Sequence, residues 1–349
     1  ERSRFLHQLE FEPVFKVTEE SLAARVAFQL PKKITVMKDR AVMKTLEKLH
    51  QPGMNNKLSP SAINTYLNCT LRFYFRYIKE LKEPEMVMEE LDPALFGSVL
   101  HKAMELLYKP FCGKVILPDH IEKIRKDESK ITSVIDMAFK KEYFGNSEAE
   151  FSGGNIIVRE VIDKYLLQIL KVDKIYAPFR ILDLEEEYIT MITLHNRQKI
   201  RIGGIIDRID EKDGIIRIVD YKTGQKKDTF PDIESLFEPS GFKRNDAVFQ
   251  MFLYALIYKD LKNAACIVPG LYFIRDIFSD RFDYMISLKE ARKKKIPVEN
   301  AVVYLQEFED KLKETLTQVL DPEVPFTQTD DTETCTYCPY RAICHRGMI

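Results

Sequence analysis

The chain has 349 residues, with 53 Lys and Arg against 54 Asp and Glu, and a formal net charge of −1. Its 45% hydrophobic and 31% charged content excludes the disordered and fibrous classes. The balanced charge argues against a wholly basic nucleic-acid coat protein. No apolar run approaches the roughly 20 residues that span a bilayer, and no secretory signal is visible, so we expect a cytoplasmic protein without a membrane partner.

The first part of the chain is irregular in pattern and is interrupted by prolines. Because the sequence begins at Glu1 rather than Met, we expect residues 1–56 to be a lead-in from a longer polypeptide, with one helix near 40–50. Residues 57–349 are expected to form one domain. Ser59 and Pro60 provide an N-cap and a proline at the first helical position, which predicts a helix there. Apolar spacing predicts further helices over 96–111, 119–143 and 155–175.

The middle of the chain changes to β-branched and aromatic residues with turn signals between them. This pattern predicts a three-stranded antiparallel meander over 181–194, 199–210 and 215–221. A helix over 247–261, two strands over 267–275 and 281–287, and a long helix over 300–320 are expected to follow. Helices, then a sheet, then helices around further strands indicate an α/β, or mixed α+β, fold.

Two carboxylates and a lysine fall on neighbouring strands of the predicted meander. Asp207 lies in the second strand, and Asp220 and Lys222 lie two residues apart near the end of the third, so those two share a face. The two carboxylates converge only if the antiparallel strands are offset or bent. Carboxylate oxygens suit Mg²⁺ or Mn²⁺, which activates a phosphodiester and a water for hydrolysis. The alternative is an exposed hairpin with solvated charges, because Asp-x-Lys triplets are common.

Six cysteines are distributed unevenly along the chain. Cys335, Cys338 and Cys344 form a compact group near the C-terminus, and Cys69 is the natural fourth ligand of a tetrahedral site or cubane cluster. Clustered cysteines in a chain of this size favour a metal site over disulfides. Spacing alone does not separate zinc from iron–sulfur. The remaining two, Cys112 and Cys266, have apolar neighbours in sequence and are expected to be buried.

Basic residues gather near these cysteines. Arg72, Arg76 and Lys79 are predicted to share one helical face, and Arg341 and Arg346 follow the C-terminal cysteine group. We expect both segments to meet and to form a basic, aromatic surface that contacts a phosphate backbone. A solvated helix face without a partner is the alternative.

Four motifs in order resemble the RecB-like and AddB-like branch of the PD-(D/E)XK nuclease superfamily. They are Gly97…His101, Gly204…Asp207-Arg208-Ile209-Asp210, Asp220-Tyr221-Lys222-Thr223-Gly224 and Gln250…Tyr254. The resemblance implies a restriction-endonuclease-like core, in which a central mixed sheet is flanked by helices.

The resemblance also implies a role for each motif residue. Asp207 and Asp220 are then ligands of Mg²⁺ or Mn²⁺ near the main-chain carbonyl of Tyr221 or Val219, and His101 is a further ligand or positions one. Lys222 is then the catalytic lysine, and Gln250 and Tyr254 line the DNA path or support the site. Arg208 and Asp210 are expected to form structural ion pairs.

Members of this branch carry a [4Fe–4S] cluster on one cysteine before the nuclease motifs and three after them. The resemblance therefore implies that Cys69, Cys335, Cys338 and Cys344 hold such a cluster and join the N- and C-terminal parts of the domain, with Zn²⁺ as the alternative. The implied function is a DNA exonuclease in repair or recombination, acting with a helicase subunit or a helicase-like region of the same polypeptide. The alternatives are a catalytically silent module that binds DNA ends and a zinc-stapled structural domain.

Overall fold

The computed structural model describes residues 3–14, 16, 18, 20, 32–49, 56–82, 93–145, 151, 153–239, 244–290 and 294–346. The chain divides into two compact units, Glu1–Lys33 and Ile34–Ile349. The described part of the first unit holds one helix, α1 (Arg4–Phe11), whose N-cap Ser3 accepts a hydrogen bond from the Phe5 amide. Among the described residues, no helix has the length and apolar character needed to cross a membrane.

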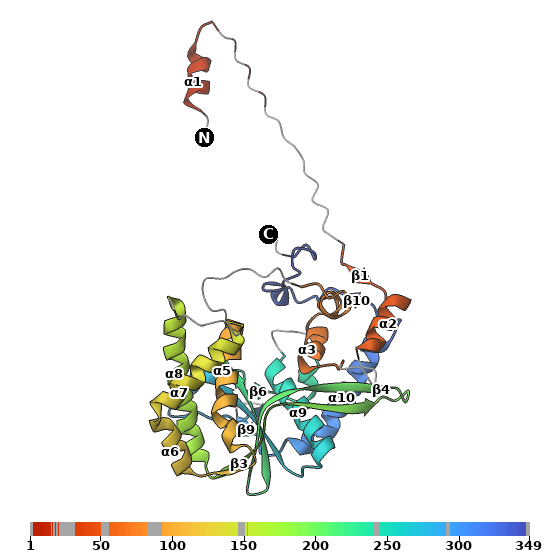
Figure 1. Ribbon diagram of the computed structural model, residues 1–349. Helices are drawn as coiled ribbons and strands as arrows, with labels where there is room; N and C mark the ends of the chain where they lie inside the picture. The colour runs from red at the N-terminus through yellow and green to blue at the C-terminus, as the bar shows by residue number, and fades with distance from the viewer. Residues whose placement is uncertain are drawn as a thin grey trace. The chain divides into compact units, whose positions relative to one another are not determined.

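A five-stranded mixed sheet forms the centre of the second unit (Figure 1). Its order is β2 (Val115–Ile116), β3 (Phe179–Thr193), β4 (Lys199–Lys212), β5 (Ile215–Lys222) and β7 (Ile267–Phe273). Each of the first four strands is antiparallel to its neighbour in this order, whereas β7 runs parallel to β5. The predicted meander is confirmed, and with it the α/β fold class with a mixed central sheet.

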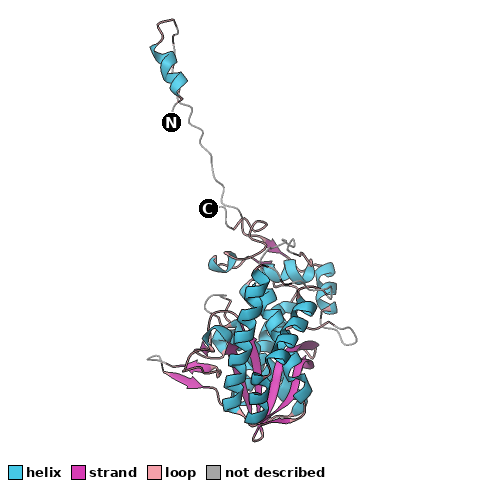
Figure 2. Ribbon diagram, turned by 60° about the vertical axis from the view of Figure 1, so that its left-hand side comes forward, coloured by secondary structure: helices cyan, strands magenta, loops and turns pink. Residues whose placement is uncertain are grey.

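Helices cover both faces of this sheet (Figures 1 and 2). One face packs against α5 (Pro93–Tyr108), α6 (Pro118–Lys126), α7 (Glu128–Glu142) and α8 (Gly154–Tyr176). The opposite face packs against α3 (Pro60–Asn68), α9 (Asp246–Lys262) and α10 (Leu305–Leu320). Alternate residues of β5 serve the two cores, because side chains along a strand point to opposite faces. Val219 and Tyr221 join the first core, and Ile218 joins the second.

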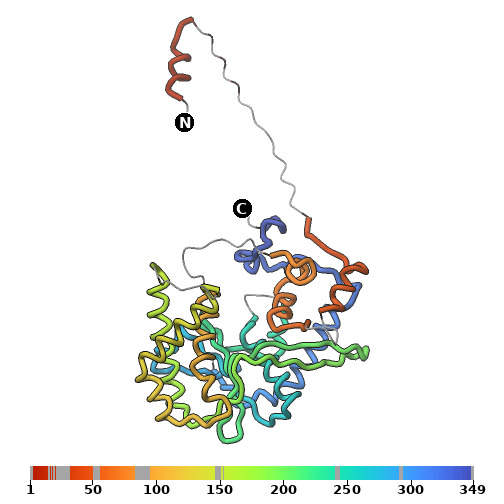
Figure 3. The backbone as a smooth tube through the Cα atoms, in the orientation of Figure 1, coloured from red at the N-terminus to blue at the C-terminus, as the bar shows by residue number. Residues whose placement is uncertain are grey.

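The segment before α3 packs with the C-terminal part of the domain (Figure 3). Here β1 (Thr35–Val36) pairs antiparallel with β10 (Phe326–Thr327), and α2 (Arg40–Lys48) follows. The buried Lys38 ammonium donates hydrogen bonds to the carbonyls of Gln318 and Asp321, at 2.8 and 2.9 Å. Residues 34–49 of the expected lead-in thus contribute to the second unit.

The remaining short elements lie around the sheet. After α3 come α4 (Thr70–Phe73) and a π-helix (Tyr74–Ile78). A separate three-stranded sheet contains β6 (Thr229–Phe230), β8 (Ser287–Lys289) and β9 (Lys295–Pro297). Short 3₁₀ helices cover the following ranges: Lys109–Phe111, Glu234–Leu236, Ile274–Asp276, Ala301–Tyr304 and Glu333–Cys335.

Two predicted elements differ from the structure. The helix expected over 119–143 is two helices, because the Asp127 carboxylate caps the start of α7 by accepting from the Lys130 amide. The strand expected over 281–287 is wrong: an isolated bridge joins Met285 to Gly270, and β8 begins only at Ser287. Residues 277–281 form turns, so the chain enters no sheet there.

Candidate metal centre

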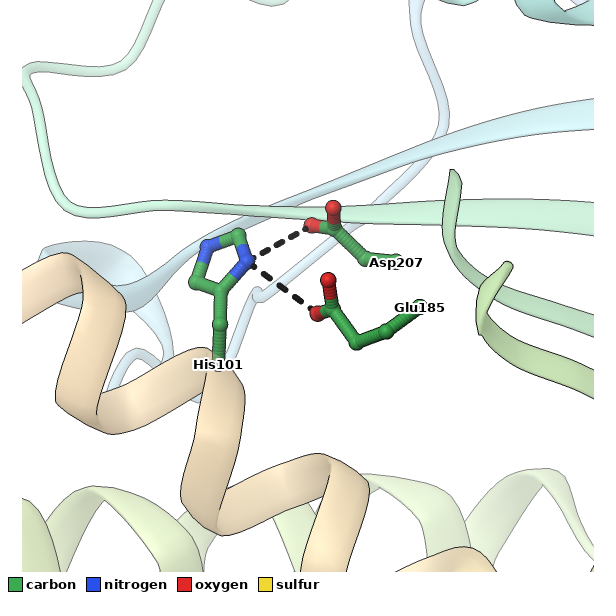
Figure 4. Close-up of side chains that lie close together, drawn as sticks. All are labelled: His101, Glu185 and Asp207. Carbon is green, nitrogen blue, oxygen red and sulfur yellow. Dashed lines mark ion pairs between the residues drawn. The ribbon is translucent and has the colours of Figure 1, made fainter. Parts of the chain in front are cut away.

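Three potential metal ligands converge from three elements (Figure 4). His101 comes from α5, Glu185 from β3 and Asp207 from β4, and one ligand atom of each lies within 4.8 Å of the others. The His101 Nδ1 atom is 3.3 Å from Asp207 Oδ2 and 3.5 Å from Glu185 Oε1. An imidazole nitrogen and two carboxylate oxygens at these separations are a suitable donor set for Mg²⁺ or Mn²⁺.

Sequence reasoning missed Glu185. It lies opposite Asp207, between the cross-strand pairs Leu184–Arg208 and Glu186–Ile206. A register shift between Ile181 and Asp183 reverses the alternation of β3, so strand periodicity alone does not reveal which of its acidic residues faces the site. The signal available in the sequence is only the run Glu185-Glu186-Glu187.

The backbone at Glu185 is in an uncommon conformation. Its φ is 48°, in the left-handed region that non-glycine residues seldom adopt. Such conformations are energetically unfavourable and concentrate at functional sites, where surrounding packing maintains them. The observed backbone therefore points independently to the same position as the convergence of donors.

The main chain of Tyr221 connects two of the donors. Its N–H donates to Asp207 Oδ2 at 2.9 Å, and its carbonyl oxygen lies 2.8 Å from His101 Nε2. A proton on Nε2 leaves Nδ1 as the ligand atom, which is the usual way an outer contact orients a histidine ligand. The carbonyl thus contacts His101, while its predicted role as a ligand stays a prediction.

Burial and charge act in opposite directions on His101. Burial disfavours the imidazolium, but the Asp207, Glu185 and Asp220 carboxylates together outweigh it and raise the pKa of His101 well above its usual value. A cation is therefore favoured between these groups, and a divalent metal would displace the proton.

Asp220 and Lys222 lie next to this group. Regular pairing of β4 with β5 ends at Arg208 and Val219, and the next pair in this register would be Asp207 with Asp220, so the two carboxylates come from facing positions on adjacent strands. Lys222 Nζ is 2.9 Å from Asp220 Oδ2. Burial raises the pKa of Asp220 to about 6, with Asp207 adding to the rise and Lys222 opposing it. Asp220 is therefore paired with Lys222, and its role as a metal ligand stays a prediction.

The side chains of α9 extend this chain of contacts. Lys222 Nζ donates to Gln250 Oε1 at 2.7 Å, and Gln250 Nε2 donates to the Tyr254 hydroxyl at 2.9 Å. Gly204 makes the arrangement possible, because a Cβ there would lie 2.9 Å from Tyr254 Cε1 and 3.1 Å from Pro60 Cδ. The glycine of the Gly-x-x-Asp motif therefore allows the tyrosine to approach the strand.

A buried ionic cluster occupies the opposite face of the same strands. Arg208 pairs with Asp173 and Asp210, and Arg217 pairs with Asp210, at 2.7 to 2.8 Å. All four side chains are fully buried. The Tyr108 and Tyr272 hydroxyls donate to Asp173 at 2.6 and 3.0 Å. The expectation that Arg208 and Asp210 form structural pairs is confirmed.

A second candidate site lies at the C-terminal segment. Cys69, at the junction of α3 and α4, lines one pocket together with Cys335, Cys338 and Cys344. Burial and the neighbouring Cys69 thiol raise the pKa of Cys335. All six cysteines lie within the described residues, and none of them forms a disulfide.

The two remaining cysteines differ from expectation. Cys112 is exposed and Cys266 is only half-buried. Cys112 follows the 3₁₀ turn Lys109–Phe111 at the surface, where its thiol contacts the Leu182 carbonyl at 3.2 Å. Apolar neighbours in sequence did not lead to burial because the chain turns outward here.

The basic residues are divided between two adjoining pockets. Arg72 and Arg76 line a pocket with Tyr77, Tyr337 and Tyr340, so the predicted meeting of the two basic segments is confirmed. The cysteine pocket is lined by the following arginines: Arg72, Arg341 and Arg346.

The predicted shared helical face holds for Arg72 and Arg76, which line one pocket, and stays a prediction for Lys79. The π-helix changes the spacing after Phe73, and Lys79 Nζ lies 5.6 Å from the centre of the Tyr74 ring. A role of Arg72, Arg76, Lys79, Arg341 and Arg346 in DNA binding stays a prediction.

The family model of the PD-(D/E)XK nuclease superfamily matches residues 57–345. The chain belongs to this superfamily. Among curated proteins, it is 30% identical over 182 residues to a subunit of the ATP-dependent helicase/deoxyribonuclease of Streptococcus uberis. It is 29% identical over 177 residues to the corresponding protein from Streptococcus agalactiae. These matches cover 50% and 49% of this chain but only 14% of each relative.

A solved structure, that of SSO0001, aligns with 83% of this chain and 96% of its own, with 11% identity and a TM-score of 0.26.

Proposed function

We propose that this domain is a divalent-metal-dependent deoxyribonuclease, working as an exonuclease on DNA ends in repair or recombination. The observation that carries the proposal is the convergence of His101, Glu185 and Asp207 beside the Asp220–Lys222 pair. Membership of the nuclease superfamily and similarity to helicase/deoxyribonuclease subunits support it. A helicase subunit or helicase-like region as partner, and a cytoplasmic location, are part of the same proposal.

The residues divide the chemistry between them. His101, Glu185 and Asp207 hold Mg²⁺ or Mn²⁺, with Asp220 adjacent, and the cation supplies charge neutralisation at the phosphate and acidifies a water. Lys222 orients that water or stabilises charge on the phosphate oxygens. Gln250, held by Tyr254, fixes the position of the Lys222 ammonium.

A cleavage assay on end-labelled single- and double-stranded DNA with Mg²⁺ tests the proposal. Asp207→Asn and Lys222→Met should each lower the rate by roughly 10²–10³-fold, since each removes electrostatic stabilisation that no other group replaces. Asp136→Asn is the matched control and should cleave normally, because it removes a carboxylate charge of α7 that pairs with Arg159 of α8. Full activity in both site variants would overturn the assignment. Tight DNA binding by a wild type that never cleaves with Mg²⁺ or Mn²⁺ would identify the silent module instead.

We also propose that Cys69, Cys335, Cys338 and Cys344 hold a [4Fe–4S] cluster. Four thiols from opposite ends of the domain line one pocket, and four thiolates are the donor set of such clusters. Protein purified without oxygen should be brown and should contain about four irons per chain. Stoichiometric zinc without iron would favour the zinc site. If anaerobically purified protein contained neither iron nor zinc, the proposal that these cysteines are metal ligands would be contradicted.

The adjoining basic pockets form the proposed DNA contact. Arg76→Ala and Arg341→Ala should each weaken DNA binding and reduce the slope of log K against log salt by about one, because each arginine neutralises one phosphate. An unchanged salt slope would remove these residues from the interface.

A further inference from the structure

The side chain of Tyr221 is buried beside α5, and its main chain contacts the metal centre. Asp220 and Lys222 face α9, whereas the Tyr221 ring is buried in the core on the α5–α8 face of the sheet, 3% exposed. Its N–H and carbonyl meet Asp207 and His101. Tyr221 thus joins the buried ionic cluster to two candidate metal ligands, Asp207 of β4 and His101 of α5.

The hydrogen bond from the Tyr221 N–H to Asp207 matters because the regular pairing of β4 with β5 has already ended at this point. The last regular pair between β4 and β5 is Arg208 with Val219, so Tyr221 has an Asp207 carboxylate where continued pairing would place a β4 carbonyl. A second hydrogen bond joins β4 to β5 beyond their last regular pair: Arg208 Nη1 donates to the Tyr221 hydroxyl at 3.3 Å. The two ties connect consecutive residues, Asp207 and Arg208, to one residue of β5.

Arg208 is a firm anchor for this tie. Its guanidinium is fully buried and is held by Asp173 and Asp210, at 2.7 and 2.8 Å. The tyrosine ring also packs edge-on against His101, with ring centres 5.8 Å apart. An outer contact that orients ligands in this way commonly changes metal affinity when it is removed.

We propose that Tyr221 is a positioning residue: its hydroxyl bond to Arg208 fixes the main chain that orients Asp207 and His101 for the divalent cation. The inference rests on the proposed metal site. The hydroxyl itself contacts neither the cation nor the substrate. Removing it therefore alters the separation of β4 and β5 at the point where the ligands must meet.

Tyr272 offers a matched control. It pairs in register with Tyr221 on the neighbouring strand, lies in the same core, and has its hydroxyl in the same cluster, where it contacts Asp173 and Arg217 at 3.0 Å each. Tyr221→Phe and Tyr272→Phe thus remove the same atom from the same cluster, and only the first releases a residue whose main chain touches the ligands.

The test is Mn²⁺ affinity of the full chain, followed by electron paramagnetic resonance, together with thermal unfolding. Tyr221→Phe should raise the Kd for Mn²⁺ roughly tenfold, whereas Tyr272→Phe should stay within about twofold of wild type at a similar loss of thermal stability. In the cleavage assay Tyr221→Phe should lower kcat and leave KM for DNA unchanged. Equal Mn²⁺ affinity of the two variants would overturn the proposal.

A measurement on the wild type covers the case in which Tyr221→Phe does not fold. In hydrogen exchange of the metal-free protein, the Tyr221 amide should be protected as well as the Tyr272 amide, although its hydrogen-bond acceptor is the Asp207 carboxylate and not a strand carbonyl. Exchange of Tyr221 orders of magnitude faster would show that the side-chain ties do not hold it. A wild type that binds Mn²⁺ but cleaves no DNA would refute the proposed function and leave this inference open to the same affinity test.

Discussion

The strand centre around Asp207 and the C-terminal segment around Cys335 are organised by opposite means. At the strand centre, Arg208, Asp210 and Asp173 are fully buried, and Arg208 forms ion pairs with both carboxylates. Up to residue 346, where the described part of the chain ends, the segment around Cys335 has one short 3₁₀ helix, Glu333–Cys335, and its Tyr337 is 88% exposed. The two candidate sites therefore differ in what holds their proposed ligand residues in place.

The difference predicts which interactions hold each candidate site in its folded conformation. Protein packing and hydrogen bonds hold the strand centre before any cation binds, which is the condition for a preorganised site. The cysteine pocket brings together Cys69 and three cysteines from the C-terminal segment. That segment itself contains little regular secondary structure. Bound metal or cluster is expected to contribute much of its stability, because ligand binding and folding are coupled there.

The largest expected effect comes from breaking the buried cluster. Asp173→Asn leaves Arg208 with one carboxylate fewer in a site without solvent, and removing one partner of a buried ion pair costs about 3–5 kcal/mol. Urea denaturation should show this loss. The exposed pair of Lys295 with Asp228 is the control, since Lys295→Met should cost at most about 1 kcal/mol. Similar losses in the two variants would contradict the view that the strand centre is self-supporting.

A smaller effect is expected at the cysteine pocket. Cys69→Ser should destabilise the ligand-loaded domain by about 2–4 kcal/mol, because it releases a cross-link across a long loop. Hydrogen exchange should locate the loss to residues 328–346 and leave the amides of β4 and β5 protected. Loss of protection throughout the sheet would show instead that the two regions are not independent.

Lys38 gives the smallest effect and a test of the N-terminal boundary. Burial lowers the pKa of Lys38 to about 8, with Asp321 opposing the shift. Between about pH 8 and 10 the folded protein has released this proton and the unfolded chain retains it, so stability from this group rises with pH. Relative to Lys38→Met, the wild type should gain about 1–2 kcal/mol over this range. A constant difference from pH 7.5 to 10 would show that burial does not lower the pKa of Lys38 in the folded protein.

Much of the fold could be predicted from the sequence. Periodicity located the meander and the long helices, because those segments bury one regular face. The strand over 281–287 was wrong, since a strand needs a partner edge that local pattern does not reveal. The same limit explains the missed Glu185: a register shift in β3 changes which side chains face the site. Motif residues such as Lys222 and Gln250 were singled out because the motifs resemble those of a nuclease family, and not from their spacing alone.

The pairing of β1 with β10 has a consequence for the order of folding. Proteins are synthesised from the N-terminus, and domains generally fold as units once their chain is available. Thr35 pairs with Thr327, and the Thr70 hydroxyl both donates to and accepts from the Thr327 main chain. The elements between β1 and α4 therefore wait on the ribosome for residues almost 300 positions later. Until then the aromatic side chain of Phe73 lacks its stacking partner Phe326, so the nascent domain presents an apolar surface that chaperones are suited to cover.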